Sequence, residues 1–77
     1  MDIKILGIGC HKCNTLEKLT RIVVEENGID ATITKVVEIE EIIKYGILAT
    51  PALVVDEIVQ IKGYVPSIEE IKMILLR

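Results

Sequence analysis

Residues 8–14, Ile-Gly-Cys-His-Lys-Cys-Asn, hold both cysteines of this 77-residue chain, Cys10 and Cys13. The pair lies where a strand-like apolar run gives way to a helical pattern. If Cys13 falls in the first helical turn, Cys10 lies at the helix N-terminus, where unpaired N–H groups and the helix dipole favour a thiolate. A thiolate with a second sulfur in reach predicts dithiol–disulfide exchange.

The segments on either side of this motif differ in period. Residues 3–8 are apolar apart from Lys4, as expected of a strand covered on both faces. Polar side chains then recur at helical spacing, which predicts a helix over residues 12–26. Gly28 ends this pattern, because glycine readily adopts the left-handed conformation found just beyond helices. The cysteines are therefore expected between a strand and a helix.

Two further elements are predicted in the middle of the chain. Residues 31–37 are rich in β-branched side chains and are interpreted as an edge strand. Residues 38–45 are typical of a short helix, with Glu40 and Lys44 expected to pair and Gly46 to end it. This helix is expected to turn Ile39, Ile42 and Ile43 inward.

The last third of the chain predicts a hairpin followed by a helix. Residues 52–55 and 58–62 are short strands separated only by Asp56-Glu57, a turn without the usual glycine. Ser67 and Glu70 form a capping-box pattern that opens a final helix. Its expected inward side chains are Ile68, Ile71, Ile74 and Leu75.

The predicted order of elements is β-α-β-α-β-β-α. A right-handed crossover makes the first two strands parallel neighbours, and the hairpin must then lie on the other side of the first strand. This is an α/β fold with a four-stranded mixed sheet and three helices, expected to form one domain over residues 1–77. The Cys10 loop falls at the carboxyl end of a central strand, where open α/β sheets usually place their chemistry.

Composition excludes several classes of function. The formal net charge of −3 is spread along the chain, without the basic stripe that binds nucleic acid. No apolar run approaches the roughly 20 residues of a membrane span, and the N-terminus shows no secretory signal pattern. A soluble, cytoplasmic protein is expected. In that reducing compartment the two cysteines are poor candidates for a structural cross-link.

Three short motifs follow one another at informative positions: residues 7–13 after the first strand, Thr50-Pro51 before the third and residues 62–64 after the fourth. With them the chain resembles the thioredoxin fold in its minimal form. The resemblance is to the small archaeal and bacterial thioredoxin/glutaredoxin-like redox-active disulfide proteins, and it covers essentially the whole length.

The resemblance implies a role for each motif. Cys10 would attack a substrate disulfide and Cys13 would resolve the mixed disulfide, so that a Cys10–Cys13 disulfide is the redox centre and no other cofactor is needed. Thr50-Pro51 would contain a cis peptide bond, lie beside the sulfurs and offer backbone groups to an extended substrate. Gly63 would keep the nearby groove shallow.

Substrates implied by the resemblance are disulfides in proteins or small thiols, with a thioredoxin-reductase-like protein as one electron donor. Tyr64 is assigned to the substrate groove because it follows Gly63. The chain departs from glutathione-using relatives, which tend to carry Cys-Pro-Tyr-Cys and a later Gly-Gly-x-Asp. Glutathione is therefore not implied as the reductant.

The residues between the cysteines are expected to tune the nucleophile. Lys12, and His11 when protonated, place positive charge beside Cys10, which should lower its pKa from the reference value near 8.5. Neither side chain is assigned a proton-transfer role.

Two alternative functions use the same cysteines. Two thiolates suit Cu(I) and other soft ions, so a metal-binding carrier is the main rival. A noncatalytic redox-sensing adaptor is the third. A structural zinc site is disfavoured because only His11 is available as a further ligand of the usual kind.

Overall fold

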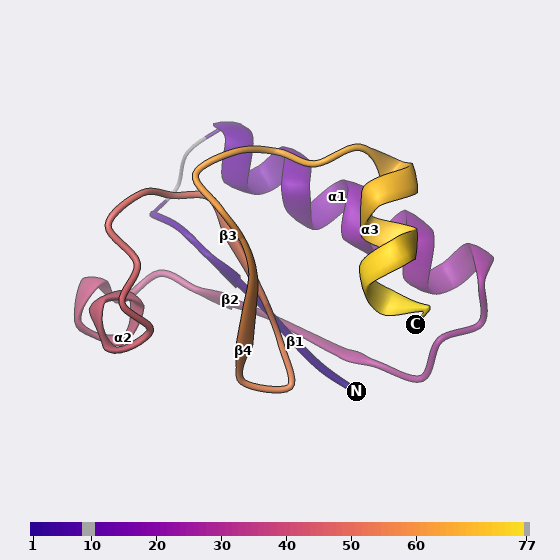
Figure 1. Ribbon diagram of the computed structural model, residues 1–77, viewed down its shortest axis with the longest axis horizontal. Coiled ribbons are helices and arrows are strands. Elements are labelled where there is room, and N and C mark those ends of the chain that lie inside the picture. Colours follow the sequence, from indigo (N-terminus) through magenta and orange to yellow (C-terminus); the bar gives the residue numbers. More distant parts are fainter. Residues whose placement is uncertain (9–10, 77) are drawn as a thin grey trace.

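The computed structural model describes residues 1–8 and 11–76, which form a mixed sheet with helices on both faces (Figure 1). The elements are β1 (Asp2–Leu6), α1 (His11–Glu26), β2 (Thr32–Val36), α2 (Ile39–Lys44), β3 (Ala52–Val55), β4 (Ile58–Lys62) and α3 (Ile68–Leu75). The predicted α/β class and element order are confirmed. Strand β1 ends at Leu6, two residues earlier than predicted.

The strand order in the sheet is β2-β1-β3-β4, with β1 parallel to β2 and antiparallel to β3. Leu6 at the end of β1 pairs with Val36 of β2 on one side and with Ala52 of β3 on the other. The chain therefore leaves β1 at the same edge of the sheet where it enters β3. This is the edge at which the sequence places the cysteines and Thr50-Pro51.

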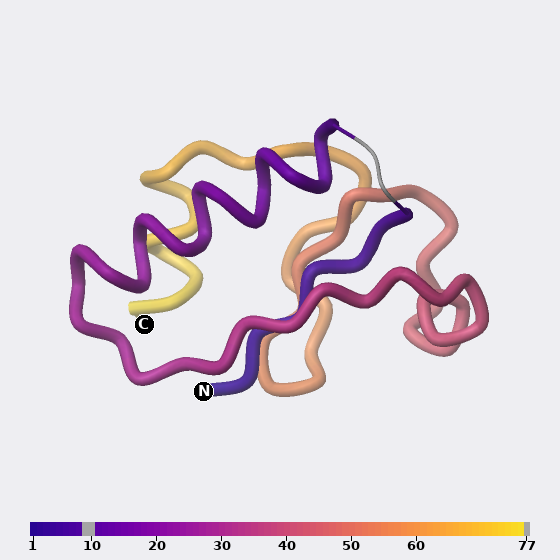
Figure 2. Tube along the Cα trace, turned by 180° about the vertical axis from the view of Figure 1, so that it is seen from behind, coloured from indigo at the N-terminus to yellow at the C-terminus, as the bar shows by residue number. Residues whose placement is uncertain are grey.

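The two faces of the sheet have separate cores. Helices α1 and α3 lie side by side over one face, while α2 lies over the other (Figures 1 and 2). The larger core joins Ile3, Ile5, Leu16, Val23, Leu53, Val55, Ile61, Ile71 and Leu75. The smaller core joins Leu6, Ile42, Ile47, Ala52 and Val54. Neighbouring residues of β1 and β3 thus serve opposite faces, as strand geometry requires.

Helix α2 is less buried than the sequence predicts. Ile42 is buried, but Ile39 and Ile43 are 59% and 57% exposed, so their predicted inward positions are wrong. The helix has only six residues, fewer than two turns, and Ile42 is its one buried side chain in the small core beneath it. Lys44 pairs with Glu41 at 3.0 Å rather than with Glu40, since residues three apart are also neighbours on a helix.

The β3–β4 turn is built without glycine. Asp56 and Glu57 have φ of 48° and 70°, and such positive values at both central positions are those of a type I′ turn. The Asp56 carboxylate accepts a hydrogen bond from the Asp2 backbone N–H at 2.8 Å. Glu57 binds the Lys4 ammonium and accepts a hydrogen bond from the Tyr45 hydroxyl. These side-chain contacts help to offset the cost of a positive φ at two residues other than glycine.

Helix α3 begins as predicted. The Ser67 side chain accepts a hydrogen bond from the Glu70 backbone N–H at 3.1 Å and so caps the helix. Ile71 and Leu75 are buried against α1 and the sheet. The cap fixes where the chain leaving β4 turns back over the larger core.

Candidate active site

Cys13 is the third residue of α1 and is fully buried. Its sulfur is disulfide-bonded. The sequence places Cys13 in the first helical turn, and the structure has it there. Cys10 lies outside the described residues, so the lowered pKa expected for its thiol stays a prediction.

The sulfur of Cys13 packs against the backbone of Gly7. An ideal Cβ built on Gly7 would lie 2.0 Å from Cys13 Sγ and 3.1 Å from Cys13 Cβ, far closer than real Cβ atoms approach other atoms. The sulfur therefore occupies the space that any side chain at position 7 would need. The Gly7 backbone N–H donates to the Val36 carbonyl at 3.0 Å, which holds this segment against β2.

The loop before β3 lies at the same place. The Thr50–Pro51 peptide bond is cis, the geometry that the resemblance implies. Thr50 Cβ lies 3.7 Å from the ideal Cβ position on Gly7, next to the Cys13 sulfur. Thr50 is exposed whereas the Pro51 side chain is fully buried. Thr50 is thus the part of this dipeptide that faces solvent.

The chain after β4 joins the Pro51 loop through one backbone contact. The Gly63 N–H donates to the Pro51 carbonyl at 2.8 Å. Gly63 has φ of +87°, a conformation that favours glycine, and its ideal Cβ would touch Ala49 at 3.4 Å. Of the predicted substrate residues, the structure therefore brings Thr50, Pro51 and Gly63 together.

The fourth predicted substrate residue, Tyr64, is held by α3. Its hydroxyl donates to the Glu70 carboxylate at 2.6 Å, and its side chain remains about half exposed. The pKa of the Tyr64 hydroxyl is raised above its ordinary value of 10.0. The main cause is the hydrogen bond to Glu70, which stabilises the protonated phenol, and the negative charge of Glu70 adds to it by opposing the phenolate. The sequence pattern gave no sign of this pairing.

This pairing predicts a titration difference. In Glu70→Gln we expect the Tyr64 phenol to ionise at lower pH than in the natural protein, measured by phenolate absorbance. Because the folded-state pKa is raised, the hydrogen bond contributes stability below pH 10 that is lost as the pH rises through the folded pKa. A Tyr64→Phe variant identifies the signal of Tyr64 against that of Tyr45. An unchanged titration in Glu70→Gln would contradict the assignment.

His11 and Lys12 form the exposed start of α1. The first turn of α1 contains no acidic residue, and the two side chains have no ion-pair partner among the residues that the structure describes. The helix N-terminus and the lysine therefore supply positive potential beside Cys13 without local compensation.

Over residues 1–8 and 11–76, no group of three or more His, Cys, Asp or Glu side chains is placed to hold a metal ion. None of the described helices is long and apolar enough to cross a membrane.

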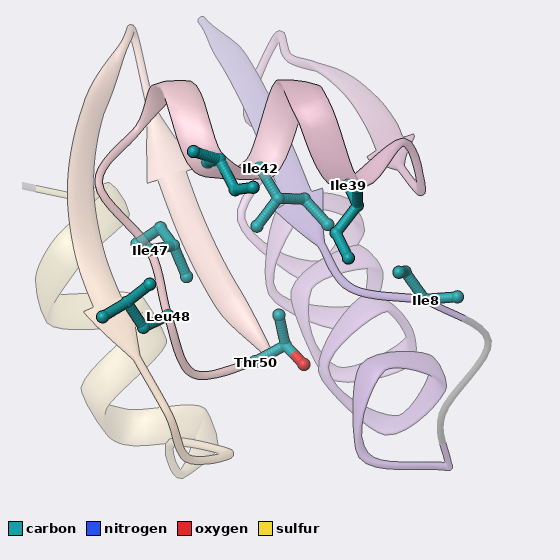
Figure 3. A pocket seen from close by; sticks show the side chains of 7 residues that line it. Ile8, Ile39, Ile42, Ile47, Leu48 and Thr50 are labelled. Atoms are coloured by element: carbon teal, nitrogen blue, oxygen red, sulfur yellow. The ribbon is translucent and has the colours of Figure 1, made fainter.

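An apolar groove adjoins the site and was not predicted. It has a volume of about 300 Å³ and is lined by Ile8, Ile39, Ile42, Ile43, Ile47, Leu48 and Thr50 (Figure 3). Sequence reasoning missed it because it assigned the α2 isoleucines to the core. The sequence motif that contains Gly7 does not indicate its packing role, since the contact with Cys13 depends on how closely α1 approaches the end of β1.

The fold and the buried, disulfide-bonded Cys13 at the start of α1 define a small α/β redox protein. Comparison with known proteins gives its family. Residues 1–76 match the family model described as Thioredoxin domain. The chain is 48% identical over 75 residues to a thioredoxin of Methanothermobacter thermautotrophicus, covering 97% of each chain. It is 43% identical over 70 residues to a thioredoxin of Methanocaldococcus jannaschii, covering 91% of this chain and 80% of the relative.

The chain therefore belongs to the thioredoxin family. It is a thiol–disulfide oxidoreductase, and the resemblance inferred from its motifs is confirmed.

Proposed function

We propose that this oxidoreductase exchanges electrons with protein disulfides, with Cys10 as the nucleophile and Cys13 as the resolving thiol. The observation that carries the proposal is the complete burial of Cys13 against Gly7. A sulfur with no exposed surface cannot meet a disulfide held in another protein. The first attack therefore falls to the other cysteine of the motif, Cys10.

The proposed reaction has two steps. The Cys10 thiolate attacks one sulfur of the substrate disulfide, forming a mixed disulfide and releasing one substrate thiolate. Cys13 then loses its proton and attacks Cys10, which forms the Cys10–Cys13 disulfide and releases the second substrate thiolate. The substrate gains two electrons and two protons, and the protein is left oxidised. A thioredoxin-reductase-like protein or a small dithiol would return it to the dithiol form.

The surroundings of the motif support Cys10 as the nucleophile and Cys13 as the resolving thiol. Cys10 directly precedes α1 in the sequence, so the N-terminus of this helix and the cations His11 and Lys12 favour a thiolate at Cys10. Thr50 is exposed, and its Cβ lies 3.7 Å from the ideal Cβ position on Gly7 that the Cys13 sulfur adjoins, so we assign Thr50 and Pro51 to the backbone that an extended substrate pairs with.

The remaining assignments complete the proposal. We place Gly63 and Tyr64 beside the bound substrate on the side of β4, where the Gly63 N–H donates a hydrogen bond to the Pro51 carbonyl. The Cys10–Cys13 pair is the redox centre without a further cofactor, and the protein acts in the cytoplasm as one domain over residues 1–77.

The test is turnover of a protein disulfide with dithiothreitol as electron donor. We expect Cys10→Ser to lose catalysis down to the rate of the uncatalysed exchange, because the remaining thiol, that of Cys13, is buried. Met73→Ser serves as a control, since Met73 is an exposed residue of α3. A metal chelator should leave the rate of the natural protein unchanged. Turnover that survives in Cys10→Ser would refute the assignment, and stoichiometric Cu(I) binding without turnover would favour the metal carrier.

A further inference from the structure

Helix α1 and the edge strand β2 are joined by side chains next to the cysteine motif. The Lys35 ammonium donates to Asn14 Oδ1 at 2.7 Å and lies 3.5 Å from Glu17 Oε1. Ile33 packs against the larger core, and the alternation of side chains along a strand puts Lys35 on the same face of the sheet. Asn14 and Glu17 are three positions apart and so share one side of α1. The first turns of α1 are therefore fastened to β2.

This contact completes a closed circuit around the Cys13 sulfur. Asn14 directly follows Cys13, and Lys35 directly precedes Val36. The Val36 carbonyl accepts the hydrogen bond from the Gly7 N–H at 3.0 Å, and Gly7 packs against Cys13 Sγ. The sulfur is thus held both through its own helix and through the backbone that leaves β1. In order, the members of the circuit are Cys13, Asn14, Lys35, Val36 and Gly7.

The bond between Asn14 and Lys35 is the hydrogen bond of this circuit that a substitution can remove, because the bond between Gly7 and Val36 joins backbone groups. Lys35 is also held by Glu17, and Glu17 by Arg21 at 3.0 Å, so the ammonium belongs to a network of charges rather than to a single pair. Surface contacts of this kind contribute little to the free energy of unfolding. Loss of the hydrogen bond should therefore affect the position of Cys13 more than the stability of the fold.

The resolving step is the part of the reaction that depends on where the Cys13 sulfur lies. Cys13 is fully buried, so its sulfur takes its position from the backbone that carries it and from the Gly7 surface that it touches. Misplacing a reacting group by about 1 Å can cost roughly 100-fold in rate. The first attack, by Cys10, does not use this sulfur and has no such dependence.

We propose that Asn14 and Lys35 are positioning residues for the resolving step, an inference that rests on the proposed roles of the two cysteines. Their hydrogen bond keeps the first turn of α1 close to β2 and so keeps Cys13 Sγ against Gly7. Both residues act through the placement of Cys13. The effect comes from the contact and not from the charge of Lys35, which distinguishes it from electrostatic tuning of a thiol.

The two steps can be timed separately with dithiobisnitrobenzoate, a small aromatic disulfide that yields coloured thiolates. The Cys10 thiolate of the reduced protein attacks one sulfur of the reagent, forms a mixed disulfide and releases one coloured thiolate. Cys13 then loses its proton and attacks the Cys10 sulfur, which closes the internal disulfide and releases the second coloured thiolate. Stopped-flow absorbance should show two phases of equal amplitude. The rate of the first phase rises with reagent concentration, whereas that of the second does not.

The decisive variant is Asn14→Ala, which removes the hydrogen bond and leaves the charge of Lys35 in place. We expect it to slow the second phase about tenfold, less than a full 1 Å misplacement would, and to leave the first phase unchanged. Lys35→Met should slow the second phase to the same extent. The double variant should be no slower, because both changes open the same circuit. Lys35→Arg keeps a donor at this position and should restore the natural rate.

The matched control is Arg21→Ala. It removes another surface ion pair of the same network, that with Glu17, but lies outside the circuit. Both phases should keep their natural rates in this variant. Chemical denaturation of each reduced variant should give an unfolding midpoint close to that of the natural protein.

The outcomes separate this inference from the function on which it rests. An unchanged second phase in Asn14→Ala would overturn the positioning role. An effect of Lys35→Met that Asn14→Ala does not share would also overturn it, because the charge would then be the cause. Equal slowing in Arg21→Ala would attribute the change to general loosening of the surface. A fast first phase that persists in Cys10→Ser, or a second phase in Cys13→Ser, would instead refute the proposed roles of the cysteines.

Discussion

Replacing Cys13 with serine is expected to arrest this protein as a covalent complex with its substrate. Cys10 still attacks, but no neighbouring thiol displaces the substrate from the mixed disulfide. A well-oriented intramolecular group reacts as though present at very high concentration, so its loss should slow release by more than about 100-fold. Mass spectrometry of the acid-quenched reaction should show one substrate molecule per protein.

The matched variant for this experiment is Cys10→Ser, which should form no adduct under the same conditions. Denaturing gels without reductant distinguish a disulfide-linked complex from noncovalent association. Adduct formation in Cys10→Ser and its absence in Cys13→Ser would reverse the two roles. That result would require the buried sulfur to become accessible, contrary to its position against Gly7.

Replacing Gly7 with alanine is expected to disturb the disulfide and the fold together. The new methyl group would lie 2.0 Å from Cys13 Sγ, so either the sulfur or the backbone just after β1 must move. Overpacking of this kind typically costs about 1–3 kcal/mol in the free energy of unfolding. A disulfide-bonded sulfur has less freedom to move than a thiol, so the cost is greater in the oxidised protein.

The reduction potential should therefore rise. If the oxidised form bears the whole cost, the shift is about 20–60 mV toward the oxidising side, at 30 mV per 1.4 kcal/mol. The measurement is a redox titration against dithiothreitol, with chemical denaturation of both forms. Gly28→Ala is the control, because Gly28 has φ of +60° and no atom within 4 Å of its ideal Cβ. It should lose stability without changing the potential.

An unchanged potential in Gly7→Ala would show that the backbone adjusts freely and that Gly7 does not position the sulfur. A shift of equal size in Gly28→Ala would attribute the effect to general loss of stability.

The elements of this fold could be predicted because their signals are local. The Ser67 cap depends on a residue three positions away, and the hairpin on two strands separated by Asp56-Glu57. The parallel pairing of β1 and β2 followed from the handedness of a single crossover. Each signal lies within one stretch of sequence and needs no knowledge of the tertiary structure.

The features that were missed depend on residues far apart in the chain. Lys4 contacts Tyr45 and Glu57, which lie 41 and 53 positions away, and no periodicity in β1 indicates either partner. The pKa of the Lys4 ammonium group is raised above its ordinary value, mainly by the hydrogen bond to Glu57 and secondly by the hydrogen bond to Tyr45. This explains how a charged side chain is accommodated in a central strand.

The groove was missed for a related reason. Ile39, Ile42 and Ile43 share one side of α2, and helical periodicity gives all three the same interpretation. Only the position of α2 over the small core separates the buried Ile42 from its exposed neighbours. Sequence pattern identifies an apolar face but not the extent of the surface that it covers.

The burial of the Cys13 sulfur has a consequence for chemical damage. Peroxide converts accessible thiolates to sulfenic acid and then irreversibly to sulfinic and sulfonic acids. The Cys13 sulfur is fully buried and packs against Gly7, so it is shielded from these oxidations. Irreversible oxidation of a cysteine is therefore confined to the proposed nucleophile, Cys10. Closure of the internal disulfide then protects that atom as well, and the resting oxidised protein outlasts conditions that would destroy an unpaired thiol.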